Sequence, residues 1–319
     1  MNVYNLPLFA EPPSFDRDSL ARKLAELASR NVFLGTSSWK YEGWLGQVYT
    51  PERYSVRGRF SERRFQQECL AEYAETFPIV CGDFSFYQFP PADYWQRLFA
   101  SSGRDLRFAL KVPEEITACV FPSHARYGAR AGQTNLSFLD AALFERMFLD
   151  VLEPYRRRVA VLIFEFGTFP RRAFDNVRQF VDVLDPFLAL LPSTFRYAVE
   201  IRNQEFLEPD YFDCLHRHGV AHVFNAWTRM PEIGRQMRLP DVFTTDFTVV
   251  RALLRRGRPY EQAVATFAPY KAIQDPNPET REAVRSLIAR TTEDGKPLYV
   301  FINNRIEGNA PATIQAIVE

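Results

Sequence analysis

The feature that most constrains the fold is a repeated alternation of short apolar segments with helix-like segments. The apolar segments are rich in β-branched and aromatic residues and cover residues 31–36, 79–86, 107–112, 160–166, 196–202, 221–226, 242–250 and 298–303. Helical periodicity occupies residues 61–76, 138–152, 174–184, 210–218, 279–290 and 310–318. The apolar segments are nearly continuous rather than alternating, which is typical of strands covered on both faces. Eight successive β–α units therefore predict an α/β protein with a parallel sheet closed into a (β/α)8 TIM-like barrel.

The doubly wound open sheet is the alternative to a barrel. When such a sheet binds dinucleotides, a glycine-rich turn usually follows its first strand. That position here reads Gly35-Thr36-Ser37-Ser38, which is not GxGxxG, so the barrel is favoured. We expect one barrel domain over residues 31–319, preceded by an N-terminal extension, residues 1–30, with a short helix at 19–29.

The composition is that of a globular protein and argues against several classes. The chain has 319 residues with 39 basic and 39 acidic side chains, and this zero net charge disfavours a nucleic-acid partner. No stretch approaches the roughly 18 apolar residues of a membrane helix, and no export signal opens the chain, so we expect a cytoplasmic protein without a membrane partner. The four Cys residues form no CxxC pair, so a zinc site built on Cys and His is not expected. The oligomeric state stays open.

Two long loops follow predicted strands, at the barrel face where function normally sits. Residues 37–60 follow the first strand and residues 113–137 follow the third. Loops of this length usually serve as lids or binding loops. In the first loop, the rings of Trp39 and Tyr41 suit stacking on a sugar or a base, or packing as a cover over the barrel.

Lys111 ends the third predicted strand. A lysine at the barrel mouth can hold a phosphate or carboxylate, or act as a Schiff-base nucleophile if burial depresses its pKa. The alternative is a lysine that extends into bulk water. The predicted position at the catalytic face favours a functional role, with anion binding ahead of covalent chemistry.

Glu200 and Arg202 are two residues apart on the fifth predicted strand. Side chains two apart on a strand point to the same side. Facing inward near the mouth, Glu200 would serve as a general base and Arg202 as an anion contact. The alternative is a structural ion pair that fills the barrel.

Glu165 ends the fourth predicted strand within an apolar run, where a carboxylate should be paired or have a raised pKa. With Glu200 on the neighbouring strand it could divide acid and base work, as paired carboxylates do in glycoside hydrolysis. The alternative is a pair with an arginine. No cofactor is predicted, although Glu165, Glu200 and Asp246 would supply oxygen ligands for a divalent cation if they converged.

Further polar residues are expected to complete the site as substrate-binding groups. Tyr87 ends the second predicted strand, on the same side as Asp83 by period-two spacing. The other candidates are Asn225, Arg251, Asn303 and Asn304. The N–H groups at the start of the last helix could take an anion near the last two, although Asn304 could equally cap a turn.

The sequence resembles a known family at the predicted strand ends. The resemblance rests on Gly35-Thr36-Ser37-Ser38-Trp39-Lys40-Tyr41 with Trp44, Phe84-Ser85-Phe86-Tyr87, Phe108-Ala109-Leu110-Lys111-Val112-Pro113 with Ile116-Thr117, Val199-Glu200-Ile201-Arg202, Asp246-Phe247 with Arg251, Val300-Phe301-Ile302-Asn303-Asn304, and Glu307-Gly308-Asn309-Ala310-Pro311-Ala312-Thr313. On these motifs, which span nearly the whole chain, it is similar to the YecE-like family, domain of unknown function 72. The resemblance implies a TIM-like barrel and no established reaction. Relatives often carry histidines where this chain has Asn203, Arg305 and Asn309, so an activity that uses them would be altered here.

Together the residues predict an enzyme that binds a small anionic molecule at the C-terminal face of the barrel. Lys111, Arg202 and Arg251 would hold the anion, and Glu200 and Glu165 would carry acid–base chemistry. Hydrolase, lyase and isomerase reactions all fit. The alternatives are a nucleic-acid-binding or processing protein, and a barrel scaffold without activity.

Overall fold

A closed parallel barrel forms the centre of the computed structural model, which describes residues 15–170 and 173–319. The order of strands around it is β1-β10-β9-β8-β7-β6-β5-β4. The barrel strands are β1 (Val32–Thr36), β4 (Ile79–Gly82), β5 (Arg107–Lys111), β6 (Val159–Glu165), β7 (Tyr197–Glu200), β8 (Ala221–Ala226), β9 (Thr248–Ala252) and β10 (Leu298–Ile302). The TIM-like barrel expected from the sequence is therefore confirmed.

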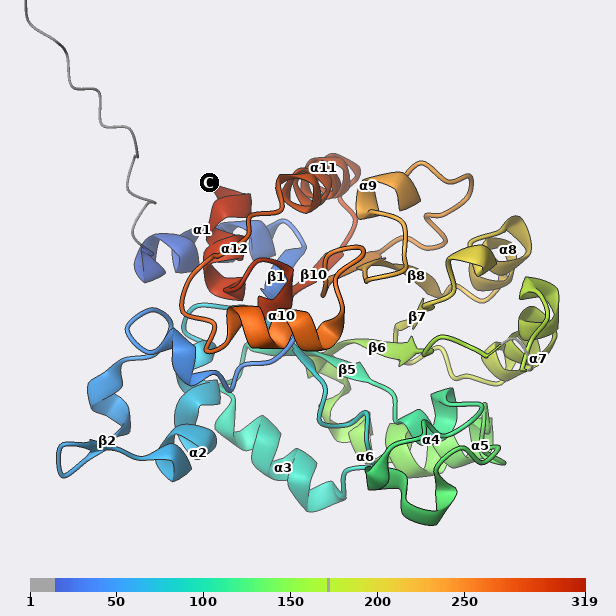
Figure 1. Ribbon diagram of the computed structural model, residues 1–319, viewed down its shortest axis with the longest axis horizontal. Coiled ribbons are helices and arrows are strands. Elements are labelled where there is room, and N and C mark those ends of the chain that lie inside the picture. Colours follow the sequence, from blue (N-terminus) through green and yellow to red (C-terminus); the bar gives the residue numbers. More distant parts are fainter. Residues whose placement is uncertain (1–14, 171–172) are drawn as a thin grey trace, which may run out of the picture.

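Helices surround the barrel strands (Figure 1). Along the chain, helices connect successive barrel strands. The longer helices are α1 (Arg17–Ser29), α2 (Glu62–Tyr73), α3 (Ala92–Ser101), α7 (Val177–Ala189), α8 (Pro209–Arg217), α10 (Tyr260–Phe267), α11 (Pro278–Asp294) and α12 (Ala310–Val318). Shorter ones are α4 (Glu114–Thr117), α5 (Ala141–Phe144), α6 (Asp150–Leu152) and α9 (Ile233–Gln236). Helices α3 and α10 were not predicted from the sequence. Within the described residues, no helix has the length and apolar character needed to cross a bilayer.

Two predicted strands differ from the structure by more than two residues at one end. The one expected at 79–86 ends at Gly82, because the chain turns there and Phe86 N–H donates to the Asp83 carbonyl at 3.1 Å. The one expected at 242–250 becomes β9, which begins at Thr248. In the segment before β9, the Thr244 hydroxyl donates to the carbonyl of Val220, the residue before β8, at 2.7 Å. This side-chain hydrogen bond takes the place of the backbone hydrogen bonds that a strand would make there.

Side chains of the barrel strands form two apolar layers. The outward layer packs against the helices and forms the larger core cluster. The inward layer fills the barrel and follows the two-residue strand period, as in Ile79 and Cys81, or Val161 and Ile163. The inward-facing apolar side chains end before the C-terminal ends of the strands. Charged side chains occupy the last positions, at the mouth of the barrel.

The long loop after β1 is anchored by one buried carboxylate, that of Glu72 on α2. It accepts hydrogen bonds from Thr50 N–H at 2.9 Å, from the Thr50 hydroxyl at 2.7 Å and from the Tyr54 hydroxyl at 2.6 Å. Arg17 of α1 lies 3.1 Å away and pairs with the same group. Burial alone would raise the pKa of Glu72, but these donors outweigh it and the net shift is downward. The first loop is thus tied to both α1 and α2. It also carries the β2 (Ser55–Val56) and β3 (Arg59–Phe60) hairpin.

Candidate functional site

Six charged side chains gather at the C-terminal mouth of the barrel and form what we term the charged cluster. Its members are Asp83, Lys111, Glu165, Glu200, Arg202 and Arg251. They lie at or just after the C-terminal ends of β4, β5, β6 and β7, and near the end of β9. Five of these six residues were expected at the site from the sequence, and the structure brings those five together.

Glu200 lies at the bottom of the cluster and is fully buried. It pairs in register with Glu165 on the neighbouring strand. Nη1 of Arg251 donates to both carboxylates, and Nη2 of Arg202 lies 2.6 Å from Glu200 Oε1. Glu200 and Arg202 therefore do point to one side, and both oxygens of Glu200 face guanidinium groups. This arrangement favours a positioning role for Glu200.

Lys111 lies beside two carboxylates. Its Nζ is 3.0 Å from Glu165 Oε2 and 3.5 Å from Asp83 Oδ1, and it lies 3.7 Å from the centre of the Phe86 ring. Burial alone would lower the pKa of Lys111, but Asp83 and Glu165 outweigh it and the net shift is upward. An ammonium that keeps its proton is a poor nucleophile, so ion pairing is favoured over Schiff-base chemistry.

Glu165 is the carboxylate at which the cations converge. Its Oε2 contacts Lys111, Arg251 and Arg202, the last at 3.3 Å. Burial alone would raise the pKa of Glu165, but the three cations hold it well below the usual range. The carboxylate is thus ionised at neutral pH. The side chain is 15% exposed, whereas that of Glu200 is at 0%, so Glu165 is the more accessible of the two.

The cluster is balanced in charge but not in hydrogen bonding. Three cationic and three carboxylate side chains compensate each other when all are ionised. Arg202 is 5% exposed, and its Nε and Nη1 find no hydrogen-bond partner among the described residues. The guanidinium stacks on the Trp227 ring at 3.9 Å. A buried donor left unpaired is costly, so Arg202 is the member best placed to donate to an added group.

A pocket of about 410 Å³ opens beside Glu165, between the loops that follow β5 and β6. Its size falls within the range of small-molecule sites. Aromatic rings of Phe86, Phe121 and Phe169 form part of its wall. Its charged lining residues are Glu114, Arg126 and Glu165. The long loop after β5 was expected to bind, but Glu114 was not singled out, because strand periodicity does not orient loop residues.

The predicted aromatic residues lie around the mouth and do not join the cluster. Tyr87 is 53% exposed, and the Arg126 guanidinium lies over its ring at 4.2 Å. Strand periodicity was expected to place Tyr87 and Asp83 on one side, but it does not apply because β4 ends at Gly82, before both residues. Trp39 is buried. Tyr41 packs on Trp44 at 4.9 Å, and burial raises its pKa to about 12. Trp39 and Tyr41 thus act mainly as a cover.

The predicted asparagines mostly hold the backbone. Asn225, buried on β8, donates to the Ile201 carbonyl at 3.2 Å. Asn303 caps a turn by accepting from Arg305 N–H at 3.0 Å. Asn304 Oδ1 accepts from Trp44 Nε1 at 3.2 Å and from the Ala310 N–H that starts α12 at 2.8 Å. The turn-capping alternative for Asn304 therefore fits the structure better than an anion site.

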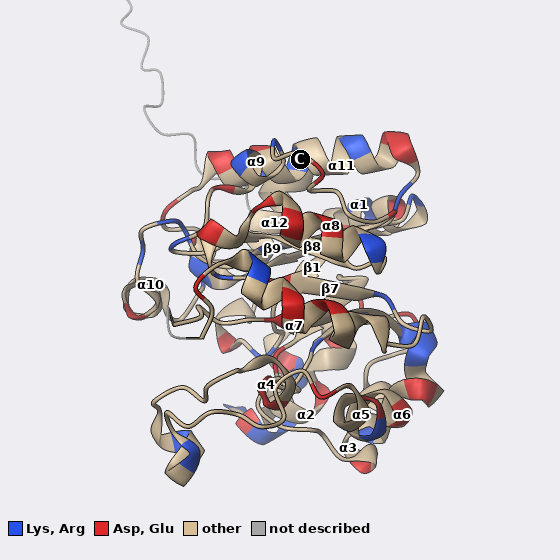
Figure 2. Ribbon diagram, turned by 90° about the vertical axis from the view of Figure 1, so that its right-hand side faces the viewer, with Lys and Arg blue, Asp and Glu red and all other residues tan. Residues whose placement is uncertain are grey.

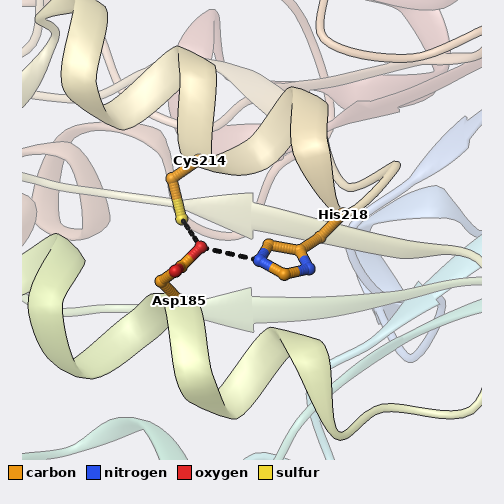
Figure 3. Close-up of side chains that lie close together, drawn as sticks. All are labelled: Asp185, Cys214 and His218. Atoms are coloured by element: carbon orange, nitrogen blue, oxygen red, sulfur yellow. Dashed lines mark hydrogen bonds and ion pairs between the residues drawn. The ribbon is translucent and has the colours of Figure 1, made fainter.

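The cation ligands considered in the sequence do not converge. Asp246 precedes β9 and so lies at the opposite end of the barrel from Glu165 and Glu200. Across residues 15–170 and 173–319, the grouping of potential ligands is instead Asp185, Cys214 and His218, between α7 and α8 (Figure 3). His218 Nε2 lies 2.7 Å from Asp185 Oδ1, and burial raises the pKa of the Cys214 thiol to about 12. Arg217 also pairs with that oxygen, so the group is best described as a helix–helix hydrogen-bond network.

Comparison with known proteins points to one family. The model of DUF72, a protein family of unknown function, matches residues 33–319. A solved DUF72 family protein from Thermotoga maritima is similar in fold, with 20% identity and a TM-score of 0.60 over 90% of this chain and 97% of that one. Another, from Enterococcus faecalis, has 14% identity and a TM-score of 0.59 over 90% and 95%. None of the curated proteins compared with the chain matches it.

Proposed function

The chain belongs to the DUF72 family, whose function is unknown, and we propose that it is an enzyme acting on a small, anionic polar molecule at the barrel mouth. The observation that supports this is the charged cluster itself. Replacing buried ion pairs by packed apolar residues is often neutral or stabilising, so stability alone does not require such a cluster. In TIM barrels the C-terminal mouth is where catalytic groups collect.

Five of the six cluster members have a role in this proposal. Arg202 donates its unpaired N–H groups to the anionic part of the substrate, and Lys111 supports it. Glu165 faces the pocket as the ionised carboxylate. Glu200 and Arg251 hold these groups in place from below. The chemistry so supplied is proton transfer, which hydrolases, lyases and isomerases share.

A ligand and turnover screen of the full-length protein tests the proposal. The panel comprises phosphate monoesters, hydroxy acids, sugars and short oligonucleotides. Binding is measured as a change in the melting temperature of the protein, and turnover as product detected by mass spectrometry. A ligand at 100 times its Kd adds about 2.7 kcal/mol to the free energy of unfolding, which is a measurable rise in melting temperature. We expect the rise with anionic small molecules, together with turnover of at least one of them.

Matched variants locate the activity. Glu165→Gln should lower turnover by about 10²–10⁴-fold, in line with the contribution of a proton-transfer group. Glu153→Gln removes a carboxylate of the same size from a half-exposed ion pair with Arg156 at 3.2 Å and should leave turnover unchanged. Equal turnover in both variants would remove Glu165 from the reaction, and no turnover of any compound would favour a scaffold.

A response to oligonucleotides alone would favour the nucleic-acid alternative. Figure 2 shows blue and red segments interspersed along the helices in that view, without a continuous basic face. Since nucleic-acid binding depends on such a face, we expect no salt-sensitive oligonucleotide binding.

A further inference from the structure

Glu114 is a carboxyl group that lies next to the charged cluster and is not part of it. It begins α4, three residues after Lys111, and its N–H donates to the Phe86 carbonyl at 2.7 Å. The residue is 5% exposed. The Tyr127 hydroxyl donates to its Oε2, whereas its Oε1 has no hydrogen-bond partner among the residues that the structure describes. It lines the same pocket as Glu165.

The groups around Glu114 act on its proton in opposite directions. Burial raises the pKa of Glu114, and the charge of Glu165 adds to that shift. Tyr127, Arg126 and Lys111 oppose it, and the net shift is upward. The pKa of Glu165 is driven the other way by its three cations. Two carboxyls of one pocket thus have separated pKa values, an arrangement by which enzymes assign acid and base roles.

We propose that Glu114 is the proton-donating residue of this pocket and that Glu165 is its ionised counterpart. This proposal deepens the proposed function and rests on it, because it takes the pocket to be the substrate site. In the step assigned here, the O–H bond of Glu114 breaks and a new bond forms from that proton to a substrate oxygen or nitrogen. The electron pair stays on the Glu114 carboxylate, which then faces the positive charges of Arg126 and Lys111.

The pocket wall restricts the substrate class. Phe86, Phe121 and Phe169 offer apolar surface, and the volume is about 410 Å³. A matching molecule has a flat or apolar face against these rings and a protonatable oxygen or nitrogen near Glu114. Its anionic group would have to extend past Glu165, which lines the pocket, to Arg202, which lies 3.3 Å beyond that carboxylate. A small aromatic or cyclic acid fits this description, whereas a chain of unbroken polar groups does not.

A neutral diazo reagent, diazoacetamide, tests the proton donor without knowledge of the substrate. A protonated carboxyl gives its proton to the diazo carbon, dinitrogen leaves, and the carboxylate forms the new ester bond. Glu115 is a built-in control, because it is the next residue and its carboxylate pairs with Arg130 at 2.8 Å. Mass spectrometry of the peptide that holds both residues reads the two esters together.

At neutral pH we expect the folded protein to be esterified at Glu114 and not at Glu115. A Glu114→Gln variant should lose that label while Glu115→Gln keeps it. Glu114 left unlabelled, or Glu115 labelled to the same extent, would overturn the assignment. The unfolded protein, in which both residues are equivalent, serves as the reference for reagent reactivity.

Kinetics then separate this proposal from the one on which it rests. With a substrate from the screen, Glu114→Gln should lower kcat by about 10²–10⁴-fold and remove the alkaline limb of the pH profile, because the acid that must stay protonated is gone. Glu115→Gln should leave both unchanged. Turnover that survives Glu114→Gln refutes the proton donor alone. Labelled Glu114 without turnover of any compound refutes the proposed function, while the proton on Glu114 stands.

Discussion

Removal of one cation from the charged cluster should cost far more than the loss of an ordinary ion pair. Arg251 is 2% exposed and contacts both Glu165 and Glu200. An Arg251→Met substitution keeps an unbranched side chain but leaves fully buried Glu200 with Arg202 as its remaining contact within the cluster. Breaking a buried pair by removing one partner typically costs about 3–5 kcal/mol, since it strands a buried charge. We expect a loss of that size.

Urea unfolding at neutral pH, followed by circular dichroism, measures this loss as a shift in midpoint at constant slope. An Arg64→Met variant is the control: Arg64 is 43% exposed and pairs with Glu68 at 3.1 Å, so its loss should stay below about 1 kcal/mol. The double variant Arg251→Met/Glu200→Gln removes the stranded charge. It should therefore be more stable than the sum of the single variants implies, by about 1–3 kcal/mol. An Arg251→Met loss no larger than that of the control, or strict additivity, would refute the reasoning.

Three further changes test other parts of the structure. Gly35→Ala would place a Cβ 1.9 Å from the Ile79 carbonyl oxygen, so we expect a loss of at least about 2 kcal/mol in urea unfolding; wild-type stability would show that β1 and β4 separate easily. The pKa of Glu72 is lowered, so the stabilisation that its carboxylate provides is present above about pH 4.5 and is lost as the pH falls. Glu72→Gln should therefore lower the free energy of unfolding by about 2 kcal/mol at pH 7 and by less at about pH 3. An equal loss at both pH values would contradict this linkage. Equimolar Zn²⁺ should leave the melting temperature unchanged, because Asp185 already accepts from His218 and the Cys214 thiol is protonated; a rise abolished by Cys214→Ser would instead assign a metal site.

The sequence was informative wherever strand periodicity applied. The repeated β–α units predicted the barrel. The two-residue period, applied to the strand expected at 196–202, placed Glu200 and Arg202 on one side, and the two do meet although Arg202 lies just beyond the end of β7. Lys111, Glu165 and Arg251 end or nearly end their strands, so their convergence follows from closure of a parallel barrel.

Residues outside the regular strands were less predictable. Asp83 and Tyr87 were aligned by a period that stops at Gly82, where the chain turns. Glu114 begins the short helix α4 in the long segment after β5, and its orientation depends on contacts outside any strand, such as its bond from Tyr127. An ion pair of Glu200 with Arg202 and an arginine partner for Glu165 were among the expected alternatives, and the structure shows both. The contact of Lys111 with Glu165 and that of Arg251 with Glu200 were not expected, because they depend on register between strands and on side-chain reach.

The charged cluster holds equal numbers of positive and negative side chains, and this affects how fast a ligand arrives. A site of balanced charge, in a chain whose net charge is zero, projects little field beyond a few ångströms. Substrate would then reach the mouth by undirected diffusion, without the 10–10³-fold acceleration that a charged funnel provides. The association rate constant should thus be nearly independent of ionic strength. Selectivity among anions would arise after contact, from the unpaired N–H groups of Arg202.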